Sequence, residues 1–457
     1  MTQSIALKPI TLACAILLAG GALAADDTKP AVAQAAAPEP AAPEPLSLYL
    51  SALLDNDRRI QSARHDADKE TLTAKGKMGE WYPNVKLTAW SGREDIDNPT
   101  GTDTKMNANE QDVTFTQLLW DFGKTSAVVQ QADLKVEKKL SSLGSTKQQV
   151  ITEAATAYVN LYRALEMQGY ARASEASLYR QLQMEQSRLG AGAGKASDVQ
   201  QAQSTLAGAS ARRARADQLV QQAGNRFLNI FGRFPANVQG LRKPAVPADR
   251  LPASVDDAVK LAMEKNPALV NARLDLNVER ETVREETASS LYPKLEFIHD
   301  YKRKNNIAGT SGIKTENFSK VQFTWDIDLG FAGRHKAAAA EFGVAKASAD
   351  LTDTERNVTE QVRNAWQALD IARRTKGYLD QQVEAAGKFL ELARKEQQAG
   401  KRSLLDVLTG ETIYMNAQSD AASADADILL SSYNLILVTG AMDLDTVTRL
   451  PSIAGGK

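Results

Sequence analysis

Side chains able to bind a metal or to attack a substrate are few in this chain and lie far apart. The three histidines are His65, His299 and His335, and no neighbouring cysteine or histidine completes a ligand pattern around any of them. Zinc sites usually take their ligands in closely spaced pairs. Positions at a surface or in a lumen suit these histidines better, and we expect no metal ion.

Two acidic pairs resemble a general acid and base, but neither has the surroundings that such chemistry needs. Glu285 and Glu286 are adjacent in a predicted helix, so their side chains leave it on different sides. Asp326 and Asp328 lie on the polar side of a predicted strand, with no nucleophile or base beside them. The sequence also has no hydrolase triad, phosphate-binding loop or zinc motif. We therefore expect no enzyme activity.

The N-terminus has the pattern of a secretory signal. Lys8 precedes an apolar run over 10–18, and residues 22–24 form a small-x-small cleavage site, so 1–24 is predicted to be a signal peptide. The only cysteine, Cys14, lies inside this segment. The mature chain would then contain no thiol, which excludes disulfides and thiol catalysis.

The composition limits which classes of protein remain possible. Residues 25–45 are rich in Ala and Pro and are predicted to be a disordered leader, since they bury too little apolar surface to offset ordering entropy. Acidic and basic residues nearly balance, at 56 against 55, which argues against a nucleic-acid partner. After residue 24 no window of about 18 uninterrupted apolar residues occurs, so any membrane crossing must use strands.

The chain is internally duplicated. Leu291–Pro293 repeats Trp81–Pro83, and Asp406-Val407 repeats Asp198-Val199, as Gly440 repeats Gly232. Both copies keep the same order of elements, which predicts a pseudo-symmetric molecule. We expect a first repeat over 46–240, a linker over 241–253, a second repeat over 254–443 and a flexible tail over 444–457.

Each repeat is predicted to begin with a helix, over 46–80 and 254–290, which the Tyr-Pro pair ends. Period-two alternation then predicts β-hairpins at about 83–120 and 293–330, with strands long enough to cross a bilayer and aromatic residues near their ends. A soluble sheet packed on helices is the alternative. The predicted membrane-facing residues are Val85, Leu87, Val113, Phe115, Leu295, Phe297, Val321, Phe323, Trp325 and Ile327.

Long helices follow each hairpin. No proline interrupts 124–189 or 334–398, and each stretch meets a glycine-containing turn before a second helix returns. Heptad spacing runs from Val199 to Ile230 in the first return helix, and Leu379 to Ala393 repeats it in the second copy. Many of these positions are alanine, which predicts closely approaching coiled-coil helices.

Four strands are too few to close a barrel, for which about eight is the practical minimum. An open sheet edge in lipid would leave backbone groups without hydrogen bonds. If the strands span a membrane, the chain must therefore oligomerise, and this argument allows a dimer or a trimer.

The duplicated order of helix, Tyr-Pro, strand hairpin and long helices, together with the nonapeptide Gly400–Leu408 and its echo over 192–199, resembles the TolC-type outer-membrane factors. The resemblance covers about 46–443. It implies a mixed α/β membrane protein in the outer membrane of a Gram-negative bacterium, reaching into the periplasm. Three chains would form a 12-stranded transmembrane β-barrel in outer-membrane lipid and a periplasmic α-helical tunnel. It also implies a periplasmic adaptor, an inner-membrane ABC or other transporter, no catalysis and no cofactor.

The resemblance also assigns a periplasmic gate at the helix turns. Asp406 matches an acidic ring at the constriction, Arg402 matches a basic tether between coils, and Ser197 with Asp198 match its partners. A plainer explanation for both aspartates is that acidic residues are favoured near helix N-termini. The turn glycines expected to lie at the adaptor contact are Gly192, Gly194 and Gly400.

Two positions depart from the family pattern. Thr409 stands where some members have a second acidic ring, and Gln397 replaces a tethering aromatic residue. Compared with members that have both residues, the constriction is therefore expected to carry less negative charge and to be held closed less tightly.

The functional hypothesis is a passive exit duct for type I protein secretion. Residues 400–414 resemble the branch that exports large adhesins or RTX-type proteins, and no lipid-attachment cysteine is found. A multidrug or small-molecule efflux duct is the alternative within the same class. A periplasmic coiled-coil scaffold that never enters the membrane is the alternative from a different class.

Overall fold

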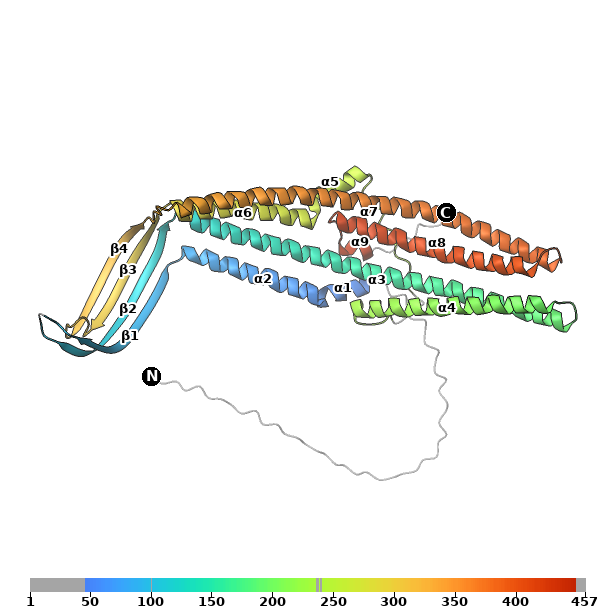
Figure 1. Ribbon diagram of the computed structural model, residues 1–457, viewed down its shortest axis with the longest axis horizontal. Coiled ribbons are helices and arrows are strands. Elements are labelled where there is room, and N and C mark those ends of the chain that lie inside the picture. Colours follow the sequence, from blue (N-terminus) through green and yellow to red (C-terminus); the bar gives the residue numbers. More distant parts are fainter. Residues whose placement is uncertain (1–45, 100, 236–237, 239–240, 449–457) are drawn as a thin grey trace, which may run out of the picture. The chain divides into compact units, whose positions relative to one another are not determined.

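The computed structural model describes residues 46–99, 101–235, 238 and 241–448. The predicted signal peptide and leader, with Cys14, lie outside the described residues, as does the end of the predicted tail. The described chain contains two copies of one arrangement, each with a strand hairpin and a long helical hairpin (Figure 1). The predicted mixed α/β class, with a duplicated unit of long helices and four strands per chain, is confirmed.

The first helical segment of each copy is broken, so the prediction of one continuous helix was wrong in both. Helices α1 (Leu46–Asn56) and α2 (Arg58–Met78) replace the first, and α5 (Val255–Lys265) and α6 (Pro267–Leu291) replace the second. Asp57 caps α2 by accepting from the Arg59 N–H at 2.8 Å. Asn266 caps α6 in the same way, and Pro267 starts that helix because it needs no N–H partner there.

The strands form one antiparallel sheet in sequence order. Its members are β1 (Asn84–Ile96), β2 (Thr104–Trp120), β3 (Lys294–Asn305) and β4 (Ile313–Thr324). Residues directly opposite each other share a face of the sheet. The register Val85↔Phe115, Phe115↔His299 and Phe297↔Val321 therefore places eight of the ten predicted membrane-facing residues on a single face.

Trp325 and Ile327 are the exceptions, because β4 ends before them. Thr324 is the last residue of β4 and lies opposite Lys294. The next partner along β3 would be Pro293, which has no N–H to give to a ladder. The Trp325 indole instead donates to the Leu291 carbonyl at 3.2 Å.

In both copies an aspartate between the sheet and the long helix accepts a backbone N–H at the start of that helix. The Asp121 carboxylate accepts the Thr125 N–H at 2.7 Å at the start of α3 (Lys124–Gly190). Asp328 accepts the Ala332 N–H at 3.1 Å at the start of α7 (Ala332–Gln398). Alternation had assigned Asp328 to a strand, yet its structural role is to cap a helix.

The long helices α3 and α7 have 67 residues each, and each returns through a tip into a partner, α4 (Ala196–Phe231) or α8 (Leu404–Val438). On α4 the predicted heptad buries Ala202, Ala209, Ala216 and Phe227. The second heptad, 379–393, lies on the outgoing helix α7 because the return helix begins only at Leu404. Within the described residues, no helix is both long enough and apolar enough to cross a membrane.

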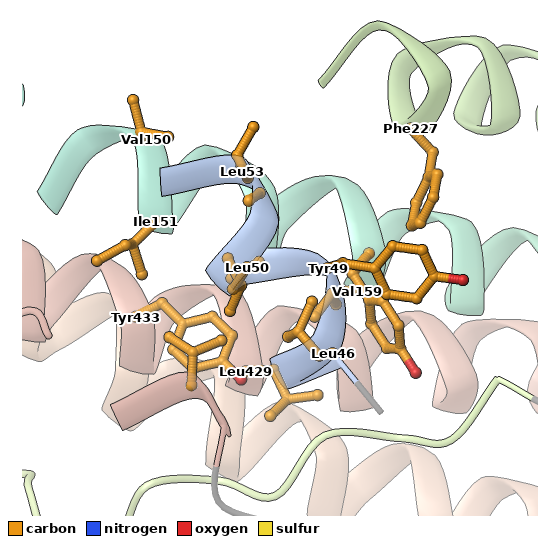
Figure 2. Packing of buried hydrophobic residues seen from close by; sticks show 14 of the residues in the cluster. Leu46, Tyr49, Leu50, Leu53, Val150, Ile151, Val159, Phe227, Leu429 and Tyr433 are labelled. Atoms are coloured by element: carbon orange, nitrogen blue, oxygen red, sulfur yellow. The ribbon is translucent and has the colours of Figure 1, made fainter. Parts of the chain in front are cut away.

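The largest apolar cluster of the described residues joins the two copies. Figure 2 shows side chains from α1, α3, α4 and α8 meeting there, among them Leu50, Val150, Phe227 and Tyr433. Part of the predicted flexible tail belongs to this cluster, since α9 (Leu444–Thr448) buries Val447 in it. That prediction was wrong for 444–448, whose apolar residue packs instead of remaining in solvent. Residues 241–253, the predicted linker, form neither helix nor strand.

The junction between the first helices and the end of the return helix differs between the copies. A Cβ on Gly440 would lie 2.3 Å from the Lys265 carbonyl oxygen, whereas a Cβ on Gly232 would meet nothing within 4 Å. The Asn266 amide also donates to the Val438 carbonyl at 2.7 Å. The second junction is therefore closed and the first is open.

We expect Gly440→Ala to destabilise the protein more than Gly232→Ala. Both glycines have positive φ, 75° and 70°, so both substitutions carry the left-handed penalty of about 1–2 kcal/mol. Only the Cβ at 440 meets backbone, which adds about 1–3 kcal/mol for overpacking. Thermal unfolding of the detergent-solubilised protein, followed by helical circular dichroism, measures the difference. Equal losses in the two variants would contradict the closed second junction.

Candidate gate at the helical tips

Both helical hairpins turn through the same backbone motif. Gly192 and Gly400 adopt φ of 75° and 74°. At the first tip the Ala193 N–H donates to the Arg188 carbonyl at 2.9 Å, and at the second Lys401 donates to Glu396 at 2.9 Å. These are Schellman caps, which need a residue without a Cβ penalty at the left-handed position. The predicted turn glycines Gly192 and Gly400 therefore lie at the two tips.

Gly194 is required for a different reason. A Cβ there would lie 2.7 Å from the Leu189 backbone nitrogen. The chain thus folds tightly back on the end of α3 before α4 begins, which only glycine allows.

The two return helices start differently. The Ser403 hydroxyl donates to the Asp406 carboxylate at 2.9 Å and accepts the Asp406 N–H at 3.3 Å, which caps α8. The N-cap of α4 is Lys195, and it makes no capping bond through its side chain. Ser197 reaches only its neighbour Asp198, at 3.5 Å. Asp406 thus lies in the first turn of α8, and its carboxylate remains half exposed beside Arg402.

Arg402 is held by its own chain. Its Nη1 lies 3.3 Å from a Glu396 carboxylate oxygen, and its Nε lies 3.6 Å from Asp406. The guanidinium also stacks over the Phe389 ring at 5.1 Å. The structure therefore brings Arg402 and Asp406 together within one tip, a pair that the family resemblance did not give.

The predicted partners Ser197 and Asp198 make no bond to Arg402 within the described chain, because they belong to the other tip. Thr409 is exposed one turn further along α8. Any link between Arg402 and Asp198 would have to join two chains.

Gln397 connects the two outgoing helices. Its amide donates to the Glu185 carboxylate of α3 at 3.2 Å. Glu185 is only 2% exposed and is also bound by Gln181 at 3.0 Å and by Arg188 at 3.5 Å. A buried carboxylate is tolerated only when such partners surround it. Gln397 is therefore part of a polar link between α3 and α7.

Arg394 was missed by the sequence analysis, although it joins three helices. From α7 its guanidinium pairs with Glu411 of α8 and donates to the Ser177 hydroxyl of α3 at 2.9 Å. Glu411 is only 7% exposed. The available signal was a charge inside an apolar stripe, since Glu411 follows Leu404 and Leu408 at heptad spacing.

The seam arginine of α4 is also paired. Arg213 donates to the Glu175 carboxylate at 2.8 Å, and Ser210 donates to the same group at 2.7 Å. These hydrogen bonds, that of Ser210 first, lower the pKa of Glu175. The pair ties α3 to α4 midway along the hairpin.

At the other end of the helices, aromatic side chains gather where they meet the sheet. Phe122 stacks on Tyr292 with ring centroids 5.3 Å apart, and Trp120 meets Phe122 edge-on at 6.0 Å. These side chains and the apolar face of the sheet, including Leu87 and Phe323, remain largely exposed in a single chain. An apolar face bordered by aromatic residues is typical of a strand region in contact with lipid.

Within the described part of the chain, no group of three or more His, Cys, Asp or Glu side chains is placed to hold a metal ion. What the geometry offers is a duplicated set of long helices, two capped tips and a lipid-compatible sheet.

The family model described as outer membrane efflux protein matches residues 49–233 and 258–441, one match for each repeat. The chain belongs to the outer membrane efflux protein family. Membership confirms the predicted location in the outer membrane of a Gram-negative bacterium, with helices extending into the periplasm.

The similarity of this chain to individual relatives extends over most of their length. The outer membrane protein TolC of Vibrio cholerae is 25% identical over 397 residues, which cover 85% of this chain and 89% of that protein. The outer membrane efflux protein BepC of Brucella suis is 25% identical over 339 residues, or 73% and 72% of the two chains. A membrane protein from Pseudomonas aeruginosa shares the fold with a TM-score of 0.76 at 17% identity, covering 86% of this chain and 93% of that one.

We expect Arg394→Met to destabilise the helical hairpins by about 2 kcal/mol, because it leaves the buried Glu411 carboxylate without its cation. Adding Glu411→Leu should recover most of the loss, since the site then holds no buried charge. Lys388→Ala is the control, because Lys388 and Glu384 form an exposed pair on the same helix and such pairs contribute little. Chemical unfolding of the three variants tests this, and a loss that Glu411→Leu leaves unchanged would contradict it.

Proposed function

We propose that the protein is the passive outer-membrane exit duct of a tripartite export system and works as a homotrimer. The observation that carries this proposal is the four-stranded sheet with β1 and β4 as unpaired edges. In lipid those edges must pair, and three chains supply the twelve strands of one closed barrel. The long helices then continue the channel across the periplasm. The duct carries out no catalysis and needs no cofactor.

Cargo enters through the helical tips, where a periplasmic adaptor and an inner-membrane ABC or other transporter would engage the channel. An open groove of about 490 Å³ lies beside the polar link between α3 and α7 and is lined in part by Arg180, Met184 and Gln398. The turn glycines Gly192, Gly194 and Gly400 allow both tips to form narrow ends. These surfaces are the proposed contact for the adaptor.

The proposed cargo is protein, by type I secretion. Support comes from residues 400–414, whose sequence resembles the branch that exports large adhesins. Efflux of drugs or other small molecules is the second candidate, because the relative BepC is named an efflux protein. The periplasmic scaffold is no longer a candidate, since family membership places the chain in the outer membrane.

The gate mechanism follows from the second tip. Arg402 bridges Glu396 and Asp406 and so fixes the turn between α7 and α8. In a trimer, three copies of Asp406 would form a ring of like charge that attracts cations. Losing the arginine would loosen the turn and widen the entrance. Exposed ion pairs are individually weak, which suits a link that has to break during opening.

We expect Arg402→Ala to raise single-channel conductance in planar bilayers, and Asp406→Ala to weaken block by multivalent cations. Arg374→Ala is the matched control, because Arg374 pairs with Asp370 on the same helix away from the tip. Conductance and block identical to those of the unchanged protein would mean that the gate lies at another turn.

Deleting the gene in its host separates the two cargo classes. Loss of a particular exported protein with unchanged drug sensitivity is the expected result. Broad drug hypersensitivity with normal secretion would overturn the secretion proposal and favour efflux. Cell fractionation tests the shared part of the proposal, since release by osmotic shock would contradict an outer-membrane duct.

A further inference from the structure

The two turns of the sheet lie at the end away from the helices (Figure 1). Because the helices extend into the periplasm, these turns lie at the outer mouth of the channel. The turn between β3 and β4, residues 306–312, is hydrogen-bonded not only within its own hairpin but also to β1, which is two strands away. We call residues 306–312 the strap.

Glu94 of β1 binds the strap. Its carboxylate accepts the Ala308 N–H at 3.1 Å through Oε1 and the Gly309 N–H at 3.2 Å through Oε2. Since β2 lies between β1 and β3, the strap has to cross about two strand spacings, or about 10 Å, to make these bonds. Hydrogen bonds to an ionised group are among the stronger ones in proteins. Glu94 thus connects the turn of the second repeat to the first strand of the first repeat.

The strap lies on the face of the sheet that lines the channel. Val85 belongs to the apolar face, and alternation along β1 places Glu94 and Ile96 on the opposite face. A Cβ on Gly309 would lie 3.2 Å from the Thr104 Oγ1 atom and 3.8 Å from the Ile96 side chain. Thr104 is directly opposite Ile96, so it shares that face. The contacts of the strap with β1 and β2 are therefore made on the lumenal face.

Part of this lumenal face is covered. Ala108 is 1% exposed, and within the four described strands it is the only apolar residue buried to this degree. It lies opposite Gly92, between the positions of Trp90 and Glu94 along the sheet. The Trp90 indole donates to the Glu110 carboxylate at 3.1 Å on one side of Ala108, and the strap bound to Glu94 lies on the other. A face left open to water would not bury this alanine.

The backbone of the strap is held in a costly conformation. Asn306 and Ala308 have φ of 54° and 55°, in the left-handed region that residues with a Cβ avoid. Asn306 is compensated, because its amide donates to the Asn107 carbonyl at 3.1 Å and its Oδ1 accepts the Gly312 N–H at 2.8 Å. The side chain of Ala308 cannot form such bonds, and its backbone N–H is bound by Glu94. Loss of this carboxylate should therefore release the strap.

We propose that the strap closes part of the outer mouth and that Glu94 holds it over the lumen. In the trimer three straps, one from each chain, narrow the exit and move outward when cargo passes. This inference rests on the proposed duct, because it takes the polar face of the sheet as the lumen. It makes Glu94 a positioning residue for export, at the end of the channel opposite the helical tips.

Thiol labelling of intact cells tests whether the strap covers the lumen. The only cysteine lies in the predicted signal peptide, so Ala108→Cys gives the mature chain a single thiol. A membrane-impermeant maleimide added outside should label this thiol slowly. Adding Glu94→Ala should raise the labelling rate about tenfold, which is the effect of losing one charge-assisted hydrogen bond.

Glu296→Ala is the matched control. It removes the same charge from the same face of the sheet, but Glu296 lies near the start of β3, at the other end from the strap, where it pairs with Lys294. Rapid labelling of Ala108→Cys alone, or equal rates with Glu94→Ala and with Glu296→Ala, would overturn the strap as a cover.

A second thiol position separates this inference from the duct proposal. Thr102 is exposed in the turn between β1 and β2, so Thr102→Cys should be labelled rapidly with or without Glu94→Ala. No labelling at 102 would mean that the turns do not reach the cell surface, which would overturn both proposals. Labelling at 102 combined with a failed strap test would leave the duct proposal standing.

Polymer entry measures the mouth without any cysteine. Polyethylene glycols of graded size are added to the side of a planar bilayer that the turns of the sheet face, and those small enough to enter lower the conductance. Glu94→Ala should let larger polymers enter from that side, whereas Glu296→Ala should leave the size limit unchanged. The same size limit in the Glu94→Ala protein and the unchanged protein would overturn the closure of the outer mouth.

Discussion

A sheet of four strands has two edges, and in hydrocarbon each edge would leave a row of amide and carbonyl groups without partners. This constraint determines much of the molecule. Because β1 and β4 cannot pair with each other across so small a sheet, each must pair with another chain. The single chain also leaves apolar side chains exposed on its helices, among them Leu72 of α2 and Phe342 of α7. The requirement of the strands for hydrogen bonds and the requirement of the helices for burial are met by the same assembly.

The long helices pack against one another through small residues. Alanine occupies buried positions along α4 and α8, which lets two backbones approach closely while the exposed sides stay charged. Such a seam buries little apolar area per residue. Polar links therefore contribute at intervals, as Arg394, Glu185 and Arg213 do along the hairpins. Among the described residues, the largest apolar cluster forms where α1 and α2 meet α3, α4 and α8.

The sequence predicted most of the architecture because its main signals are periodic and occur twice. Strand alternation, heptads and the repeated Tyr-Pro pair gave the order of elements and one face of the sheet. What failed was local. The two helix breaks depend on the single capping residues Asp57 and Asn266, and the end of β4 depends on Pro293, which comes just before the partner strand β3. Of the proposed gate residues, Arg402 and Asp406 are in contact within one tip, whereas Ser197 and Asp198 lie on the other tip. Arg394 was missed because its partners, Glu411 and Ser177, lie on two other helices.

The unequal starts of α4 and α8 have a mechanical consequence. A serine cap such as that of Ser403 contributes about 1 kcal/mol to the end of a helix, and the first tip has no side-chain cap of this kind. In a ring of three chains, stiff and compliant tips would alternate. A force applied evenly to the ring would then deform every second tip first. The entrance would widen with threefold rather than sixfold symmetry. A cargo passing through it would contact three flexible α3–α4 tips that alternate with three rigid α7–α8 tips.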